Sequence, residues 1–247
     1  MRFACAVSAV FVLCFAAGCS KSADTTVEAD SRQAGLLRGA AKVLRDARAG
    51  DVIDAARADL DNDGTVETVA ITCRRRVDSR PLGGEIVVLQ TESGKPRVAW
   101  RQPKLNPWKV RIADVDGDGE REIVAGVWKK SPKDQVMAKR VFVYSWNGER
   151  MLPKWLGSRL SRRFDDFTMA DVNDDGWDEL VALETAPGGK HRVSVYRWRC
   201  FGFDWLGCSD EVEGLTGLRA VDGKLSVDTR EGQAKLEFVK DKVVIEQ

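Results

Sequence analysis

The chain is poor in histidine and tyrosine: among its 247 residues, His191 is the only histidine, and there are two tyrosines. A single imidazole excludes most zinc sites and catalytic centres that use several histidines. The sequence also lacks an excess of either charge, since 39 basic residues stand against 38 acidic ones. This balance gives no support to nucleic-acid binding, so no nucleic-acid partner is expected.

The N-terminal apolar run is too short to cross a bilayer as a stable helix. Small residues follow it and lead to Cys19, an order typical of a secretory signal peptide over residues 1–18. The end of this segment resembles a bacterial lipobox, although Ala16 stands where that motif most often has leucine. The resemblance implies lipidation of Cys19; the alternative is ordinary cleavage near Gly18.

Lipidation would anchor an exported protein to a bacterial membrane without a membrane-spanning helix. By resemblance to Gram-negative lipoproteins, Ser20 after the lipidated cysteine favours the outer membrane, facing the periplasm or the surface. Residues 19–35 are small and polar, which predicts a flexible tether. Residues 36–51 are expected to form a short helix or linker, because their apolar residues recur at helical spacing.

One acidic loop occurs three times, as ADLDNDGTVETVA (58–70), ADVDGDGEREIVA (113–125) and ADVNDDGWDELVA (170–182). We refer to these as loops 1, 2 and 3. Oxygen-bearing side chains recur at positions 1, 3 and 5 of each loop, counted from its first Asp, with glycine at position 6 and Glu at position 9. Alternate residues of a tight loop can direct oxygens at one centre, and several hard oxygen donors favour Ca²⁺.

The candidate ligands are the side chains at positions 1, 3, 5 and 9 and the carbonyl at position 7. They are Asp59, Asp61, Asp63, Thr65 and Glu67 in loop 1; Asp114, Asp116, Asp118, Glu120 and Glu122 in loop 2; and Asp171, Asn173, Asp175, Trp177 and Glu179 in loop 3. Up to three Ca²⁺ ions are expected. Loop 3 is expected to be the weakest site, because its position 3 is a neutral amide.

The loops have two other possible interpretations. An EF-hand is excluded because position 12 is alanine in every copy and the downstream residues resemble strands. Metal-free acidic hairpin turns are the remaining alternative. The mutual repulsion of clustered carboxylates without a cation argues against that alternative.

The repeat is longer than the loop, since the loops begin 55 and 57 residues apart. Each unit contains four strand-like segments and a recurrent tryptophan, which is expected to pack between units; these are Trp100, Trp155 and Trp205. Four antiparallel strands per unit of this length are typical of a propeller blade.

The loops resemble the FG-GAP/VCBS repeat family, whose signature D-x-[DN]-x-D-G-x-x-[DE] matches residues 59–67, 114–122 and 171–179. The resemblance covers about residues 52–214 and implies propeller blades with calcium between their first two strands. Two features depart from the family. Position 9 is Glu where the family usually has Asp, and the phenylalanine–glycine motif is absent from these loops.

The expected fold is therefore all-β, a small β-propeller over residues 52–247 with three clear blades and one degenerate blade. The blades are expected at about 53–107, 108–163, 164–214 and 215–247. A closed monomer is favoured; the alternative is an open array that closes by dimerising or by binding a partner.

Three cysteines lie in the expected propeller, and no C-x-x-C or catalytic constellation is present. Export favours disulfides. A bond between Cys200 and Cys208 is one possibility; Cys73–Cys200 and free thiols are the others.

The repeats, the anchor and the lack of a catalytic set predict a binding or scaffold module for a protein or glycan partner, rather than an enzyme. His191 is expected in a surface loop. The alternatives are a propeller hydrolase and a purely structural envelope lipoprotein.

Overall fold

A computed structural model describes residues 21–45, 50–131, 134–157 and 160–246 of the chain. Strands account for 62% of the residues and helix for 9%, so the all-β prediction is confirmed. The expected signal peptide and Cys19 lie outside the described ranges. Within these ranges, no helix combines the length and apolar character needed to span a membrane.

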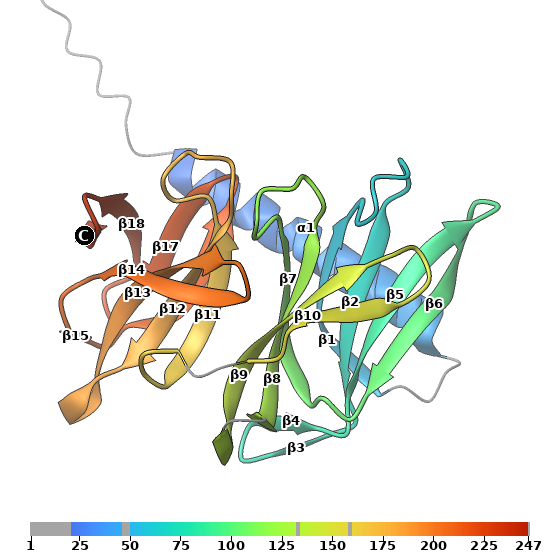
Figure 1. The fold of residues 1–247 in the computed structure, drawn as a ribbon, viewed down its shortest axis with the longest axis horizontal. Coiled ribbons are helices and arrows are strands. Elements are labelled where there is room, and N and C mark those ends of the chain that lie inside the picture. Colours follow the sequence, from blue (N-terminus) through green and yellow to red (C-terminus); the bar gives the residue numbers. More distant parts are fainter. Residues whose placement is uncertain (1–20, 46–49, 132–133, 158–159, 247) are drawn as a thin grey trace, which may run out of the picture.

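Four four-stranded antiparallel units follow one another along the chain, and we number them sheets 1 to 4 (Figure 1). Sheet 1 contains β1 (Asp51–Ala58), β2 (Glu67–Cys73), β5 (Glu85–Glu92) and β6 (Lys95–Pro103). Sheet 2 contains β7 (Pro107–Ala113), β8 (Glu122–Ser131), β9 (Asp134–Trp146) and β10 (Met151–Trp155). Sheet 3 contains β11 (Phe164–Ala170), β12 (Glu179–Thr185), β13 (Lys190–Arg199) and β14 (Gly202–Cys208). Sheet 4 contains β16 (Thr216–Val221), β17 (Lys224–Asp228), β18 (Gln233–Val239) and β19 (Lys242–Glu246).

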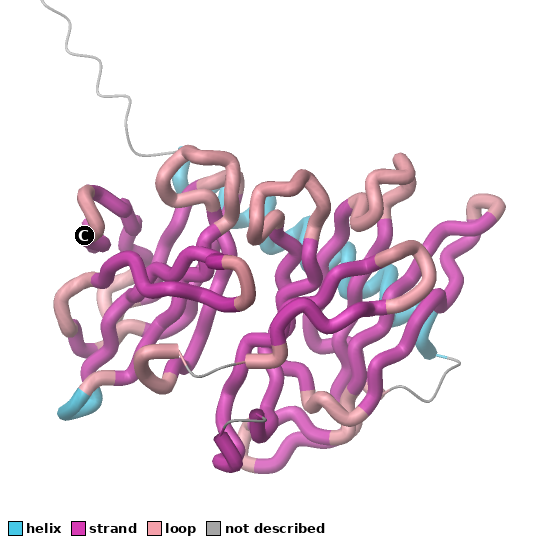
Figure 2. Tube along the Cα trace, in the orientation of Figure 1, coloured by secondary structure: helices cyan, strands magenta, loops and turns pink. Residues whose placement is uncertain are grey.

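Smaller elements connect these units. The hairpin of β3 (Arg75–Val77) and β4 (Arg80–Leu82) lies between β2 and β5 in the chain, and the short strand β15 (Val212–Glu213) pairs with β13. A short 3₁₀ helix spans Pro187–Gly189. A parallel pairing of Cys208 with Lys242 joins sheet 4 to sheet 3. The tube in Figure 2 shows how little of the described chain is helical.

The sheets stack face to face in chain order, and the apolar core is divided into layers between them. The layer between sheets 1 and 2 includes Val69, Ile71 and Ile123, and the next layer joins sheet 2 to Phe167 and Leu180 of sheet 3. A third layer lies between sheets 3 and 4. The second strands β2, β8 and β12 are buried along almost their whole length because they have a neighbour on each face.

The first strands of neighbouring sheets are linked by buried charged groups. Asp54 of β1 accepts a hydrogen bond from the backbone N–H of Val110 in β7 (3.0 Å). Lys109 of β7 donates to Asp166 of β11 (2.6 Å), and Asp166 accepts from the N–H of Leu218 in β16 (2.7 Å). Each of these three sheets therefore contacts the next one through its first strand as well as through its apolar face.

The outer face of sheet 1 is covered by helix α1 (Lys21–Leu44). Ala40 and Leu44 are buried against Ala55, Ala70 and Val87 of that sheet. A cleft of about 1060 Å³ lies between α1, the strand β1 and the strand β16. The first and fourth sheets therefore both line a cleft beside the helix, and four-bladed closure stays a prediction.

The flexible tether expected over residues 19–35 was wrong from Lys21 onward, since α1 begins there. Low apolar content suggested that this segment could not bury enough surface to fold. The segment is the extension of a helix whose second half packs on sheet 1. Gln33 also holds it there, by donating to Asp54 (2.8 Å) and to the carbonyl of Ala55 (2.9 Å).

Of the three recurrent tryptophans, Trp155 is buried and Trp100 partly buried, whereas the side chain of Trp205 is 51% exposed. Packing between units was therefore the wrong expectation for Trp205. The register explains this difference. In sheets 1 and 2, Trp100 pairs with Val88 and Trp155 with Val143. The corresponding valine of sheet 3, Val195, pairs with Gly207, and Trp205 pairs with the next residue, Tyr196.

Of the alternatives for the cysteines, the structure has free thiols at Cys73, Cys200 and Cys208, and the possible Cys200–Cys208 disulfide is not formed. Cys200 lies in the turn that joins β13 to β14. Cys208 lies at the far end of that hairpin, opposite Ser194. The hairpin therefore separates the two thiols along its length.

Candidate metal centre

The three acidic loops occupy equivalent positions, each connecting the first and second strands of a sheet at the same edge of the molecule (Figure 1). Neighbouring loops contact one another. Asn62 of loop 1 donates to the carbonyl of Gly119 in loop 2 (3.2 Å). The N–H of Asp178 donates to the carbonyl of Asp114 (2.8 Å), which joins loop 3 to loop 2. The loops therefore form a continuous row.

The same three hydrogen bonds shape every loop. The position 6 glycine N–H donates to the position 1 carboxylate at 2.9, 3.0 and 2.9 Å in loops 1, 2 and 3. The position 7 N–H donates to the position 5 carboxylate at 2.6, 2.9 and 3.1 Å. The position 9 glutamate accepts from the N–H at position 2 at 3.0, 3.1 and 3.1 Å. The repeated sequence thus encodes a repeated backbone conformation.

The glycine at position 6 is required by this conformation. Its φ is +85° at Gly64, +84° at Gly119 and +88° at Gly176, a region that other residues rarely adopt. The turn returns the chain toward the first Asp, so that the position 9 glutamate starts the next strand. These glutamates, Glu67, Glu122 and Glu179, are at most 1% exposed.

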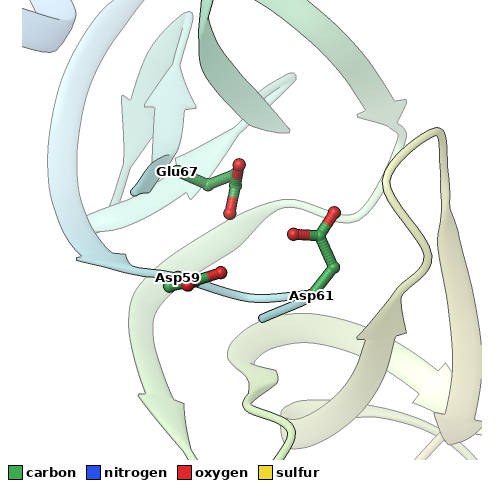
Figure 3. A group of neighbouring side chains, drawn as sticks. All are labelled: Asp59, Asp61 and Glu67. Atoms are coloured by element: carbon green, nitrogen blue, oxygen red, sulfur yellow. The ribbon is translucent and has the colours of Figure 1, made fainter. Parts of the chain in front are cut away.

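Two loops bring three carboxylates together. Asp59, Asp61 and Glu67 of loop 1 have oxygens within 4.8 Å of one another, and so have Asp114, Asp116 and Glu122 of loop 2. Figure 3 shows the loop 1 carboxylates directed at a common centre. Both groups could hold a metal ion. Positions 1, 3 and 9 were all among the ligands expected from the sequence.

The position 5 residues Asp63 and Asp118 are not members of these groups. One oxygen of each accepts from the backbone of its own loop, so these side chains shape the turn. Coordination by the carbonyls of Thr65, Glu120 and Trp177 stays a prediction. In loop 3, Asp171, Asn173, Asp175 and Glu179 form no group of three carboxylates within the described chain, since position 3 is an amide.

Loop 1 has the strongest electrostatic need for a cation. One oxygen each of Asp59, Asp61 and Glu67 is buried without a hydrogen-bond partner. Burial, followed by repulsion from Asp63, raises the pKa of Asp61. Burial likewise raises the pKa of Glu67. Unpaired buried carboxylate oxygens are costly, and a bound cation would satisfy them. The residues therefore fit a divalent metal ion.

Loop 2 already contains a positive charge at its carboxylates. The Nζ of Lys154, in β10, lies 2.6 Å from Asp116 and 2.7 Å from Glu122. Burial raises the pKa of Glu122, while the hydrogen bond from Lys154 acts in the opposite direction. The repeat pattern gives no sign of Lys154, because this residue lies 32 residues after Glu122 in the chain.

The side chains of loop 3 have a third set of partners. Arg197, in β13, pairs with Asp175 (2.6 Å) and stacks over the Trp177 ring, 4.6 Å from its centroid. The amide of Asn173 lies 3.4 Å from Glu179. Burial raises the pKa of Glu179 to about 7. No buried side-chain oxygen of this loop lacks a partner. Its rank as the weakest site stays a prediction.

From the sequence, His191 is expected in a surface loop, but this residue is the second residue of β13. Its Nε2 lies 3.0 Å from Asp165, which also pairs with Lys139. The glycines before His191 suggested a loop, but β13 begins at Lys190, directly after the 3₁₀ helix. Asp165 lies near the start of β11, at the opposite end of that strand from loop 3.

No protein-family model matches the chain, and no curated protein matches it significantly.

Proposed function

We propose that the chain is a calcium-binding scaffold module of the FG-GAP/VCBS type, carried on an exported lipoprotein. The single observation that carries the proposal is the set of buried, unpartnered oxygens on Asp59, Asp61 and Glu67. A group made only of carboxylate oxygens, without histidine or thiolate, suits Ca²⁺ better than zinc or copper. In this proposal the ion holds β1 and β2 together at the loop edge.

A propeller-like arrangement is part of the proposal. Its support is the stacking of four sheets in chain order and the buried links that Asp54, Lys109 and Asp166 make between their first strands. Helix α1 takes the place at which a fourth sheet-to-sheet contact would complete the ring. A rigid body of this kind presents loops from a fixed frame, which is the property that a binding module needs.

The partner in this proposal is an envelope protein or a glycan. The face that bears the β3–β4 hairpin has a hollow of about 450 Å³, whose lining includes Trp108 and Trp128. Indole rings offer large apolar faces with a polar N–H and are common at binding interfaces. This face lies at the opposite end of the sheets from the acidic loops (Figure 1).

Thermal unfolding with Ca²⁺, Mg²⁺ or a chelator tests the metal site. A ligand that binds only the folded state stabilises it by about 2.7 kcal/mol at 100 times its Kd. We expect the midpoint to rise with Ca²⁺ concentration and the rise to disappear in Asp61→Asn. Asp222→Asn, an exposed aspartate in a sheet 4 turn, is the matched control. A wild-type midpoint that does not respond to Ca²⁺ contradicts the proposal.

The membrane anchor has a separate test. We expect a labelled fatty acid to be incorporated into the wild-type chain expressed in a Gram-negative host, and not into Cys19→Ser. Cross-linked capture from detergent-solubilised envelopes, with and without Ca²⁺, then tests for a partner. If the same cross-linked species is recovered with an unrelated lipoprotein, the binding role is not supported.

A further inference from the structure

The three loops share one backbone conformation but differ in how their carboxylates are neutralised. Loop 1 has three buried oxygens without a partner, from Asp59, Asp61 and Glu67; loop 2 has one, from Asp116; loop 3 has none. In loop 2, Lys154 satisfies Glu122, and the N–H of Gly117 satisfies Asp114. In loop 3, Asn173 satisfies both Asp171 and Glu179. Within the described residues, no ion pair involves a carboxylate of loop 1.

The ammonium group of Lys154 neutralises two of the three carboxylates that could hold an ion in loop 2. Its Nζ is 2.6 Å from Asp116 and 2.7 Å from Glu122, the position 3 and position 9 carboxylates. Ca²⁺ binds oxygens at about 2.3–2.6 Å, so an ion held by Asp116 and Glu122 would compete with the ammonium group for these two carboxylates.

The register of the sheets identifies the residue of sheet 1 that corresponds to Lys154. In sheet 2, Lys154 is the extra residue of a β-bulge between Pro153 and Trp155. In sheet 1, the equivalent bulge between Val98 and Trp100 contains Ala99. A methyl group cannot reach or neutralise the carboxylates that Lys154 neutralises in loop 2.

The same comparison holds for Arg197, which neutralises Asp175 in loop 3. Arg197 follows Tyr196, which pairs with the first residue after Glu179. The equivalent residue of sheet 1 is Gln90, which follows Leu89. Gln90 is uncharged and donates to the carbonyl of Gly148 (3.3 Å). Loop 1 therefore has a neutral side chain at both positions from which the other loops receive a cation.

We infer that loop 1 is the single divalent-cation site of the chain, and that Lys154 serves as a built-in cation that replaces the ion in loop 2. The charge of the residue at the bulge, Ala99 beside loop 1 and Lys154 beside loop 2, then determines whether the loop binds a metal ion. The inference rests on the proposed function, because it assumes that loop 1 binds Ca²⁺. It revises the expectation that the chain binds up to three Ca²⁺ ions.

Calcium stoichiometry of the full chain, purified in detergent and freed of metal, tests this inference. Calorimetric titration with Ca²⁺ alone should give one ion per wild-type chain. Lys154→Met keeps the length of the side chain but removes its charge, and should give two ions per chain. Lys95→Met removes an exposed lysine of β6 and should leave the value at one.

The reverse exchange is made in sheet 1. Ala99→Lys should reduce the stoichiometry from one ion to none, while Ala99→Met, of similar length but uncharged, should retain binding. Circular dichroism shows whether each variant is folded. If Ala99→Lys does not fold, the Lys154→Met result decides the question alone.

The outcomes separate the two proposals. Asp61→Asn should abolish wild-type binding and Asp116→Asn should leave it unchanged. A wild-type chain that binds no Ca²⁺ contradicts the proposed function and the assignment of loop 1, whereas a gain of one ion in Lys154→Met would still support the role inferred for Lys154 in loop 2. Two ions in the wild type, one of them lost in Asp116→Asn, would overturn the inference and leave the proposed function standing. An unchanged stoichiometry in Lys154→Met would also overturn it.

A second measurement does not depend on stoichiometry. In Lys154→Met, Asp116 and Glu122 lose their counter-charge, so the unfolding midpoint in chelator should fall below that of the wild type. Saturating Ca²⁺ should reverse this loss. A midpoint that stays low at every Ca²⁺ concentration would indicate that Lys154 has only a packing role.

Discussion

At the scale of single residues, Gly117 shows how closely loops 2 and 3 are fitted. A Cβ placed on Gly117 would lie 1.8 Å from Nε1 of Trp177, and its φ is +71°. Gly119, two residues on, has a φ of +84° but nothing within 4 Å of its Cβ position. A side chain at either position would therefore be strained by the positive φ, but only at Gly117 would its Cβ also clash with Trp177.

We therefore expect Gly119→Ala to destabilise the protein by about 1 kcal/mol through backbone strain, and Gly117→Ala by at least about 2 kcal/mol more. Chemical denaturation at fixed Ca²⁺ measures both values. Equal losses in the two variants would mean that the contact between Gly117 and Trp177 is easily relaxed.

Glu184 provides a residue-scale prediction about pH. This buried carboxylate accepts hydrogen bonds from Tyr196, Ser194 (2.7 Å), Arg192 (2.8 Å) and Ser161 (3.0 Å). Burial acts to raise its pKa, but these hydrogen bonds together hold the pKa below the usual 4.5. A lowered folded-state pKa stabilises the fold above pH 4.5, and this contribution is lost as the pH falls through the folded-state value.

Glu184→Gln should therefore lower the free energy of unfolding at pH 7 by about 3 kcal/mol, since Arg192 loses its buried partner. Its stability should also decline less than that of the wild type between pH 4.5 and pH 3. Denaturation across this pH range measures the difference. Parallel curves for the two proteins would exclude the proposed contribution of Glu184.

The sequence predicted the carboxylates at positions 1, 3 and 9 because their geometry is local. Glycine, carboxylate and backbone N–H lie within nine residues, and the same hydrogen bonds form in all three loops. Lys154 and Arg197 could not be found in this way. Whether their side chains reach a loop depends on a β-bulge and on strand register, which are determined by pairing between distant segments.

At the scale of elements, helix α1 shows a different limit of sequence reasoning. Its second half has apolar residues at helical spacing and was expected to be helical, whereas its polar first half gave no such signal. The contact between its second half and the outer face of sheet 1 stabilises the helix. Leu44 is 2% exposed and packs with Ala55 and Val87 of sheet 1.

Leu44→Ala should therefore destabilise the protein by about 2–4 kcal/mol, the usual cost of a large-to-small change in a core. Arg38→Ala, an exposed position of the same helix, should change the stability by less than about 0.5 kcal/mol. Thermal and chemical unfolding compare the two. A neutral Leu44→Ala variant would mean that α1 covers sheet 1 without contributing to its stability.

At the scale of the whole molecule, the all-β class and the repeated unit were predictable because four strand patterns recur with each acidic loop. The closure of the array was not, since it depends on what packs against the outer face of sheet 1. That position is taken by α1, a helix whose polar first half resembles a tether. The degenerate fourth unit contains no acidic loop, yet it contributes a complete apolar face.

This last unit leads to a prediction about the whole fold. Leu218 and Val227 of sheet 4 are buried against Val181, Leu183 and Val195 of sheet 3. Removing residues 215–247 would expose that face of sheet 3 to water, and exposed apolar patches of this kind favour aggregation. It would also leave Asp166 without the backbone N–H of Leu218.

We expect a chain ending at Gly214 to be largely insoluble, or to unfold at a much lower temperature than the full chain. Val244→Ser in the full chain, a change at an exposed position of β19, controls for disturbance of sheet 4 that leaves the buried face intact. Hydrogen exchange should show that β12 and β13 lose protection in the truncated chain, while β2 and β5 keep more of theirs. Unchanged protection of β13 would show that sheets 1 to 3 fold without the last unit, and that sheet 4 is an independent addition to a three-sheet body.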